Sequence, residues 1–282
     1  MNFATQSVPV PVDLQPYVHQ LWFCVHQGSP DVWSAVNTCL PSGNCELILH
    51  LDDMQEEVRF GDDENAPWTL MPKHFFTGVY TEKVHWRVPG TARLMGLMLK
   101  PEGIHDLFGI SVGELSNRYV EVSNILGPDM LDLIKKLEDS APDQDVLAGI
   151  VFGFLRQRIK INEDKHSTYL TEAIRYIRRE TGAQTVEQLC EKVFVGERQL
   201  QRAFLDKIGV GPKLYGRIIR FNSACYYLQN NPTANWTSAT YAFGYTDQSH
   251  LIREFRQFTG LNPQAFLSRY RPQDGTPYAV AT

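Results

Sequence analysis

The sequence contains the stretch Leu200-Gln-Arg-Ala-Phe-Leu-Asp-Lys-Ile-Gly-Val-Gly-Pro212 and, 51 residues later, the stretch Leu251-Ile-Arg-Glu-Phe-Arg-Gln-Phe-Thr-Gly-Leu-Asn-Pro263. Both read Leu-x-Arg-x-Phe-x4-Gly-x2-Pro, so five residues are identical in one fixed frame. Self-similarity at a constant spacing indicates a duplicated structural unit. The second half of the chain is therefore expected to contain the same architecture twice.

Each copy has the pattern of an amphipathic helix. Its apolar residues recur along one helix face, as Leu200, Phe204 and Ile208 in the first copy and as Leu251, Phe255 and Phe258 in the second. The glycine that follows each stripe is typical of a helix C-terminus, and the proline three residues later is typical of the first turn of the next helix. We expect these six apolar residues to belong to the core.

A shorter helix is predicted before each copy. Thr185-Val-Glu-Gln188 is a capping box that opens a helix over 186–192, and a second short helix is expected over 236–241. A short helix, a tight turn and a longer helix with polar residues at its front form the order of a helix-turn-helix unit. Residues 213–230 predict one helix between the two units, about 27 Å long.

The same region carries a family resemblance. Gly196-Glu-Arg-Gln-Leu-Gln-Arg-Ala-Phe204 and Gly244-Tyr-Thr-Asp-Gln-Ser-His-Leu-Ile-Arg-Glu-Phe255 resemble the two halves of the AraC/XylS-type DNA-binding domain. The resemblance covers residues 166–272. The sequence departs from the family pattern at Phe194, where glycine is usual, at Gly196, where serine is usual, and at Thr240, where alanine is usual.

The resemblance implies which side chains read DNA. The residues at the matching positions are Arg198, Gln201 and Arg202 in the first unit and Gln248, Ser249 and Arg253 in the second. Arginine meets two acceptors of guanine at once, and glutamine can do the same at adenine. Arg217 and Arg220 could contact phosphate or pair within the domain, and both alternatives remain open. His250 is expected to be a packing or backbone-contact residue rather than a base reader.

The charge of the chain is divided unevenly. The 282 residues carry a net charge of −5, but residues 1–165 hold 13 Lys and Arg against 23 Asp and Glu, while residues 166–282 hold 14 against 9. The basic second half fits nucleic acid, and the acidic first half fits a regulatory domain. Five cysteines without metal-ligand spacing and the lack of an apolar run of about 20 residues favour a cytoplasmic protein with reduced thiols.

The first half is predicted to be an α+β domain over residues 1–160. Its β-prone runs lie at 32–40, 46–51, 75–80 and 92–99, with a polar loop or hairpin tip over 55–65. Helical periodicity follows over 103–108, 112–119, 130–137 and 146–159. The stretches Leu14–Trp22, Leu40–His50 and Leu97–Gly103 resemble the sensory domain of some AraC-type regulators. That resemblance implies a cupin-like β-barrel or sandwich with appended helices.

The first half shows no decisive chemistry. Glu46, His50, Trp86 and Arg93 could line a pocket or serve structural roles. The absence of a His-x-His pair argues against a cupin metal site, and Cys24, Cys39 and Cys45 lack the fourth partner that a zinc-bound methyl acceptor needs. We predict no cofactor and no catalytic residue.

The leading hypothesis is a bacterial transcription activator with an effector-sensing or dimerisation domain at 1–160, a DNA-binding domain at 166–272 and a tail at 273–282. Double-stranded DNA and RNA polymerase are the expected partners, with a small-molecule effector and a second copy of the chain as further candidates. A DNA-targeted enzyme and a regulator controlled by a partner protein remain alternatives. The sequence does not distinguish an activator from a repressor.

Overall fold

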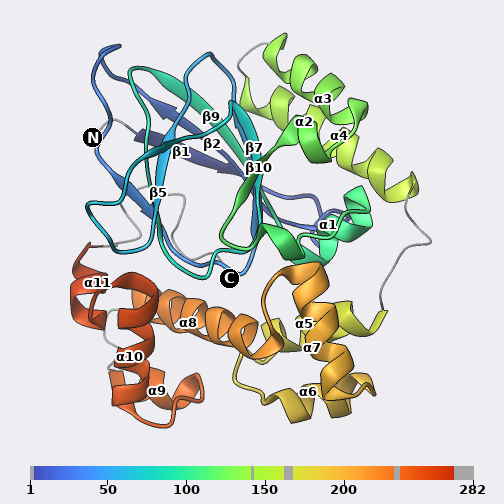
Figure 1. Ribbon diagram of the computed structural model, residues 1–282, viewed down its shortest axis with the longest axis vertical. Helices are drawn as coiled ribbons and strands as arrows, with labels where there is room; N and C mark the ends of the chain where they lie inside the picture. The colour runs from blue at the N-terminus through green and yellow to red at the C-terminus, as the bar shows by residue number, and fades with distance from the viewer. Residues whose placement is uncertain (1–2, 141–142, 162–167, 232–235, 270–282) are drawn as a thin grey trace.

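The computed structural model describes residues 3–140, 143–161, 168–231 and 236–269 (Figure 1). Over these residues, strands dominate the N-terminal part of the chain and helices alone form the C-terminal part. The predicted two-part architecture is therefore confirmed. The tail expected at 273–282 lies outside the described residues.

The described strands form two antiparallel sheets. The larger sheet has the order β1 (Phe3–Val8), β2 (Val18–His26), β9 (Ala92–Leu99), β4 (Cys45–His50), β7 (His74–Thr77) and β10 (Tyr119–Glu121). The smaller sheet has the order β3 (Asn37–Cys39), β8 (Val84–Arg87), β5 (Glu57–Phe60) and β6 (Thr69–Leu70). Four helices follow in the N-terminal part: α1 (Pro101–Phe108), α2 (Val122–Ile125), α3 (Pro128–Glu138) and α4 (Gln144–Ile161).

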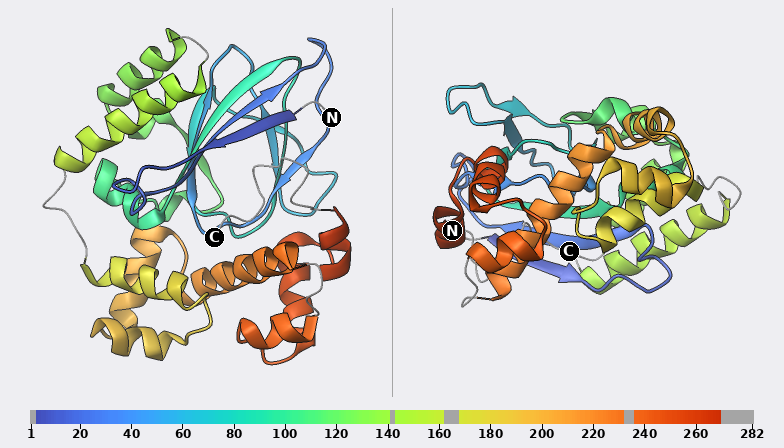
Figure 2. Two further views of the ribbon diagram at one scale, coloured as in Figure 1. Left: turned by 180° about the vertical axis from the view of Figure 1, so that it is seen from behind. Right: turned by 90° about the horizontal axis from the view of Figure 1, so that it is seen from below.

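The larger sheet is a middle layer, covered on both faces. All six residues of β4 are buried, and successive side chains of a strand point to opposite faces. Leu47 and Leu49 belong to the core that the sheet shares with the helices, whereas Ile48 belongs to the core between the two sheets. Figure 2 shows α3 and α4 lying along one side of the sheets. The predicted sandwich with appended helices is confirmed.

The first half also contains structure that the sequence patterns did not indicate. β5 lies within the predicted loop or hairpin tip at 55–65, and β1, β2, β6 and β8 were not predicted at all. The helix predicted over 112–119 is wrong, because only a 3-10 turn, η1 (Gly113–Leu115), and the start of β10 form there. Asn117 has a φ of 55° and its side chain bonds to Thr81, which stops a helix at this point.

The side chain of Trp22 crosses the larger sheet from β2 to β4. It lies over Gly96 of the intervening strand β9, where an added Cβ would come within 2.0 Å of the indole ring. The indole nitrogen of Trp22 donates a 2.7 Å hydrogen bond to Oε1 of Glu46. Gly96 thus leaves room for a tryptophan that reaches a buried carboxylate between the sheets.

Glu46 and Trp86 also line a small cavity between the two sheets. Two of the four pocket candidates from the sequence are therefore brought together. His50 is fully buried beside Glu56, with 3.7 Å between Nε2 and Oε2. Arg93 is not among the cavity residues, and its guanidinium donates instead to the carbonyl of Leu51 at 2.9 Å.

Seven helices form the described C-terminal part. They are α5 (Thr168–Arg179), α6 (Val186–Val193), α7 (Glu197–Ile208), α8 (Pro212–Asn230), α9 (Trp236–Ala242), α10 (Gln248–Thr259) and α11 (Pro263–Arg269). The helix α8 has 19 residues and spans about 28 Å, close to the predicted length. In Figure 1, α8 runs beneath the sheets and joins α6 and α7 at one end to α9 and α10 at the other.

The two parts of the molecule are packed against each other. One continuous hydrophobic core includes Leu47 of β4, Phe204 of α7 and Phe221 of α8. The loop before β4 adds polar contacts, because Arg178 of α5 donates to Oδ1 of Asn44 at 2.8 Å and Asn222 of α8 donates to the carbonyl of Pro41 at 3.0 Å.

A second contact joins the N-terminal part to α7. A Cβ on Gly113 of η1 would lie 2.4 Å from the carbonyl oxygens of Leu205 and Asp206. Only glycine allows this close approach. The contact touches the C-terminal end of α7 and leaves its N-terminal turns exposed.

Burial of Glu46 makes the stability of the protein depend on pH. Burial raises the pKa of this carboxyl to about 7, against the opposing effect of the Trp22 hydrogen bond. The folded state then holds a proton that the unfolded chain releases near its ordinary pKa of 4.5, so the contribution of Glu46 to stability falls as the pH rises from about 4.5 to 7. We expect Glu46→Gln to gain up to about 3 kcal/mol in free energy of unfolding relative to wild type over this range.

Urea unfolding of the wild type and of Glu46→Gln, in a sodium buffer at pH 4.5, 6 and 8, measures this difference in free energy of unfolding. Glu57→Gln is the matched control, because Glu57 pairs with Arg87 at 2.6 Å and is partly exposed. A difference between wild type and Glu46→Gln that stays constant with pH would contradict the assignment.

Candidate nucleic-acid interface

The first helix-turn-helix unit consists of α6 and α7. The predicted capping box opens α6, since Thr185 Oγ1 accepts from the backbone of Gln188 and the Gln188 side chain accepts from the backbone of Thr185. Phe194 ends α6 in the left-handed conformation, with a φ of 55°. Glycine adopts this conformation without strain. Phe194 therefore departs from the family pattern at the position where the backbone of the turn favours glycine.

The second unit consists of α9 and α10. Asp247 caps α10, because its side chain accepts a 2.7 Å bond from the backbone nitrogen of His250. The corresponding cap of α7 is Gly196, which offers no side chain. Buried Thr240 donates a 2.7 Å hydrogen bond from its hydroxyl to the carbonyl of Trp236, so its polar group is satisfied where the family pattern has alanine.

Both longer helices bury the predicted stripe. Each of its six residues is 0% exposed: Leu200, Phe204, Ile208, Leu251, Phe255 and Phe258. The glycines at 209 and 260 end the helices with φ values of 87° and 72°. The two units thus share their core pattern, their helix ends and the exposed face opposite the core.

The six predicted base readers all lie on that exposed face. Among the described residues, the guanidinium groups of Arg198 and Arg202 have no hydrogen-bond or ion-pair partner. In the second unit, Gln248 donates to the hydroxyl of Thr237 at 2.6 Å, and Arg253 donates weakly to the carbonyl of Ser249 at 3.3 Å. The arginines of both helices are therefore available to an external anion or base.

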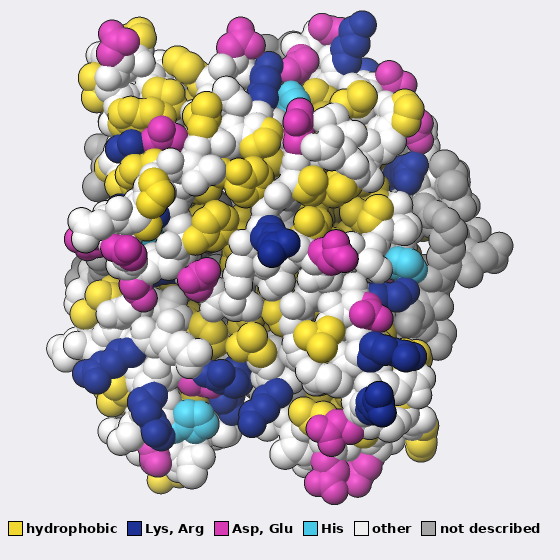
Figure 3. Space-filling view, in the orientation of Figure 1, with side chains coloured by type: hydrophobic (Ala, Val, Ile, Leu, Met, Phe, Trp, Pro, Cys, Tyr) yellow, Lys and Arg dark blue, Asp and Glu magenta, His cyan; other side chains and the backbone are white. Residues whose placement is uncertain are grey.

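A groove separates the two units. This inter-unit groove has a volume of about 850 Å³ and is lined by Gly182–Val186, Leu189, Glu197, Pro212, Lys213, Gly216, Arg217, Arg220, His250, Arg253, Glu254 and Gln257. Figure 3 shows the notch between the two lower lobes, with Lys and Arg side chains along its borders. Lys213, which the sequence analysis missed, lies there at the start of α8 and is exposed.

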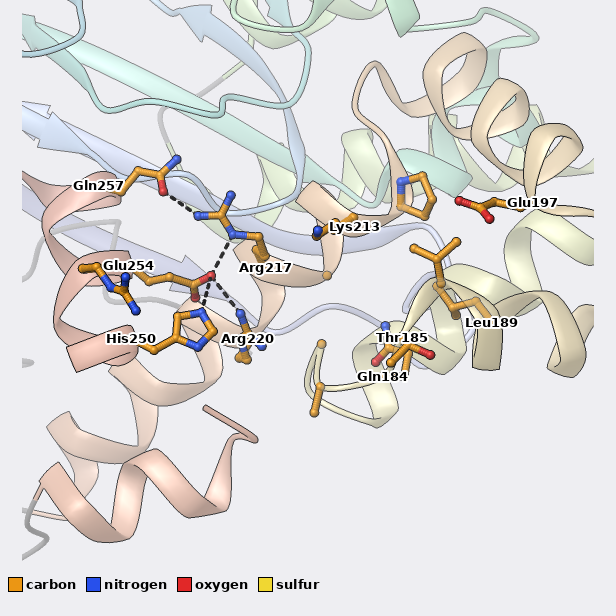
Figure 4. Close-up of a pocket in the computed structure, with 16 residues that line it drawn as sticks. Gln184, Thr185, Leu189, Glu197, Lys213, Arg217, Arg220, His250, Glu254 and Gln257 are labelled. Carbon is orange, nitrogen blue, oxygen red and sulfur yellow. Dashed lines mark hydrogen bonds and ion pairs between the residues drawn. The ribbon is translucent and has the colours of Figure 1, made fainter. Parts of the chain in front are cut away.

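The arginines of α8 that face this groove are paired within the domain. The carboxylate of Glu254 on α10 is 2% exposed and accepts from Arg217 and Arg220, each at 2.8 Å (Figure 4). Arg217 also donates to Gln257 at 2.5 Å, and Arg220 lies 4.5 Å from the ring centre of Tyr245. Of the two alternatives for these arginines, the structure favours internal pairing.

His250 belongs to the same network. Its ring packs edge-on against Tyr245 and its Nε2 lies 3.8 Å from Glu254. Burial, together with the nearby charge of Glu254, raises the pKa of the Tyr245 phenol, which therefore stays neutral. These contacts agree with a packing role for His250. The sequence analysis did not identify Glu254 as the centre of the network. An acidic residue directly beside an apolar stripe is a signal that could have indicated a buried ion pair.

Comparisons with known families agree with this geometry. Residues 189–269 match the family described as a helix-turn-helix domain, and residues 6–121 match a domain of unknown function (DUF6597). The C-terminal part of the chain is an AraC-type helix-turn-helix domain. No curated protein sequence shows significant similarity to the chain.

The solved structures that the chain is similar to share little sequence with it. ToxT from Vibrio cholerae is 11% identical over 88% of this chain and 98% of its own, with a TM-score of 0.44. An unsaturated-fatty-acid-bound form of ToxT is 10% identical, covering 88% and 94%, with a TM-score of 0.43. A probable AraC family transcriptional regulator from Rhodopseudomonas palustris is 25% identical over 38% of this chain and all of its own, with a TM-score of 0.34.

Three further properties concern the described residues alone. None of their helices is both long and apolar enough to cross a lipid bilayer. No three of their His, Cys, Asp and Glu side chains are grouped so that they could hold a metal ion. All five cysteines are free thiols, and four of them are buried.

Replacing Glu254 should destabilise the protein. In Glu254→Ala, Arg217 and Arg220 lose the carboxylate that compensates their partial burial, so we expect a loss of about 3 kcal/mol in free energy of unfolding. Denaturant unfolding measures the loss. Glu172→Ala removes an exposed pair with Arg175 and should change stability by no more than about 0.5 kcal/mol. Equal losses for the two variants would contradict a central role for Glu254.

Relieving the strained turn should stabilise the first unit. Phe194 is 94% exposed and contributes little burial, so Phe194→Gly should remove the left-handed strain and raise the free energy of unfolding by roughly 1 kcal/mol. Val193→Gly, one residue earlier in the last turn of α6, should lower it by a similar amount. The two glycine variants therefore differ in sign, and a loss of stability in both would refute the explanation.

Proposed function

We propose that the protein is a sequence-specific, DNA-binding transcription activator that reads one asymmetric site with both helix-turn-helix units. The observation that carries this proposal is the presence of two equivalent helices, α7 and α10, with exposed arginines on either side of the cation-bordered inter-unit groove. The connecting helix α8, about 28 Å long, suits two major-groove segments one helical turn, about 34 Å, apart.

The six proposed base readers divide by chemistry. Arg198, Arg202 and Arg253 can meet guanine with two parallel hydrogen bonds, and Gln201 can meet adenine in the same way. Gln248 and Ser249 lie at the N-terminal end of α10, next to the Asp247 cap. The unpaired arginines of α7 do not have to break an internal ion pair before they contact DNA.

The N-terminal part is proposed to regulate this binding rather than to catalyse a reaction. It contacts the C-terminal end of α7 through η1 and contacts α5 and α8 through the loop before β4. A change in the sheets would therefore reach the reading helices through these direct contacts. An effector that alters these contacts would act on transcription in the bacterial cytoplasm, with RNA polymerase as the partner of the activated form.

Selection of bound DNA from a random pool should yield a site of two half-sites about one helical turn apart. For that site, Arg202→Ala and Arg253→Ala should each weaken specific binding by about 5- to 150-fold, which corresponds to 1–3 kcal/mol for a bidentate contact. Gel-shift titration against the selected site and a scrambled one measures the loss of discrimination.

Arg175→Ala is the matched control, because Arg175 is an exposed arginine of α5 that pairs with Glu172. It should bind both DNAs as wild type does. Unchanged specific affinity in both reading-helix variants, or a selected site that covers only one half-site, would overturn the proposed function.

A further inference from the structure

The cavity between the two sheets is small and unusually acidic. Its volume is about 20 Å³, which is room for one group of the size of a water molecule. Two of its twelve lining side chains are carboxylates, Glu46 and Glu56, and no Lys or Arg is among them. Both carboxylates belong to residues less than 10% exposed. Burial of this kind is costly unless a cation or hydrogen-bond donors compensate the charge.

The donors around the two carboxylates are few. Oε1 of Glu46 accepts from Trp22, and Nε2 of His50 lies 3.7 Å from Oε2 of Glu56, which is longer than a hydrogen bond. The hydroxyl of Thr77, a residue 2% exposed, lies near Tyr80 but makes no hydrogen bond of normal geometry. The cavity therefore has oxygen atoms ready to accept hydrogen bonds and space for one donor.

Aromatic rings form much of the remaining wall. Trp22, Trp86, Phe75 and Tyr80 line the same cavity. The negative face of such rings attracts cations, and the attraction is larger when the cation is removed from water. Carboxylates and aromatic rings in one small space favour a compact cation with N–H donors.

We propose that this cavity binds an ammonium group, either the free ammonium ion or the head group of a small primary amine, between Glu46 and Glu56. The inference rests on the proposed function, because it names the chemical class of signal that the N-terminal part would receive. An ammonium group has about the size of water and can donate to both carboxylates and to Thr77. The free ion matches the present volume, whereas methylammonium and longer amines require the sheets to separate.

One strand leads directly from the cavity to the DNA-binding domain. Glu46 lies on β4, two residues after Asn44, whose side chain accepts from Arg178 of α5. The carbonyl of Gly43 accepts from the same guanidinium at 3.2 Å, and a Cβ on Gly43 would lie 2.9 Å from Ile219 of α8. A shift of β4 toward a bound cation would therefore move a loop that is tied to two helices of the domain.

A second strand leads to α7. Thr77 ends β7, and the next two residues, Gly78 and Val79, contact the η1 region: Ser116 donates to the carbonyl of Val79 at 3.1 Å. Gly113 of η1 in turn lies against the backbone of α7. Both routes begin at residues that would contact the ammonium group, so its binding is expected to alter DNA affinity about fivefold or more.

The experiment uses the full-length protein at pH 8, where Glu46 is ionised although burial raises its pKa to about 7. Isothermal titration calorimetry is carried out with ammonium chloride, methylammonium chloride and sodium chloride at constant ionic strength. We expect heat and saturation with ammonium or methylammonium and none with sodium. Binding by ammonium alone identifies the free ion as the ligand class, whereas tighter binding of methylammonium identifies an amine head group. An equal response to all three salts would overturn the proposal.

Glu46→Gln should bind the ammonium probe at least tenfold more weakly, because a charged hydrogen bond is lost. Thr77→Val provides a second test that leaves both carboxylates in place, with a smaller expected loss. Glu57→Gln, on the neighbouring residue but outside the cavity lining, should bind as wild type does. Circular dichroism checks that each variant is folded. Wild-type affinity in folded Glu46→Gln would exclude the site.

Gel-shift titration in ammonium-free buffer separates this inference from the proposed function. If wild-type protein binds its selected DNA there but does not bind ammonium by calorimetry, the cavity proposal fails and the function stands. If the protein binds ammonium and no specific DNA, the proposed function fails and the cavity site stands.

Discussion

The ion-pair network around Glu254 is the interaction on which the DNA-binding geometry depends. A single buried carboxylate on α10 accepts from two arginines one helical turn apart on α8, which fixes both the distance and the rotation between these helices. The first unit is fixed to the same half of α8 by the packing of Phe204 against Tyr215, two residues before Arg217. Since α8 is one continuous helix, these two attachments determine how α7 and α10 lie relative to each other. The network also explains why two arginines near the proposed DNA surface are not available to phosphate.

Most of the helical part could be predicted from the sequence because its signals are local. The Thr185 capping box, the glycines at 209 and 260 and the two apolar stripes act within a few residues along the chain, and all of them appear in the structure. Because the unit is duplicated, the glycine and the apolar stripe each occur twice in the sequence and support the same prediction both times. Glu254 was missed because its importance depends on Arg217 and Arg220, which lie more than thirty residues away in the sequence.

The β-rich part was less predictable because strand pairing is set by distant partners. β5 was assigned to a polar loop or hairpin tip, since only its pairing with β8 and β6 makes Glu57–Phe60 a strand. The helix expected over 112–119 is absent because Gly113 packs against α7 and Asn117 bonds to Thr81, and neither contact is visible in a local pattern. Glu46 could be singled out early as a polar residue in an apolar run. Its partner Glu56 could not, because it comes from a different segment of the chain.

The structure also explains why a costly buried carboxylate is compatible with a stable protein. The Trp22 indole reaches Glu46 only because position 96 is glycine, so one residue of each of three adjacent strands is committed to this one hydrogen bond. An apolar residue at position 46 would fill the space between the sheets without any desolvation penalty. The same strand that holds the carboxylate begins at the loop that contacts α5 and α8. A position that is expensive for folding and directly joined to the DNA-binding domain is where a signal could be converted into a change of DNA affinity.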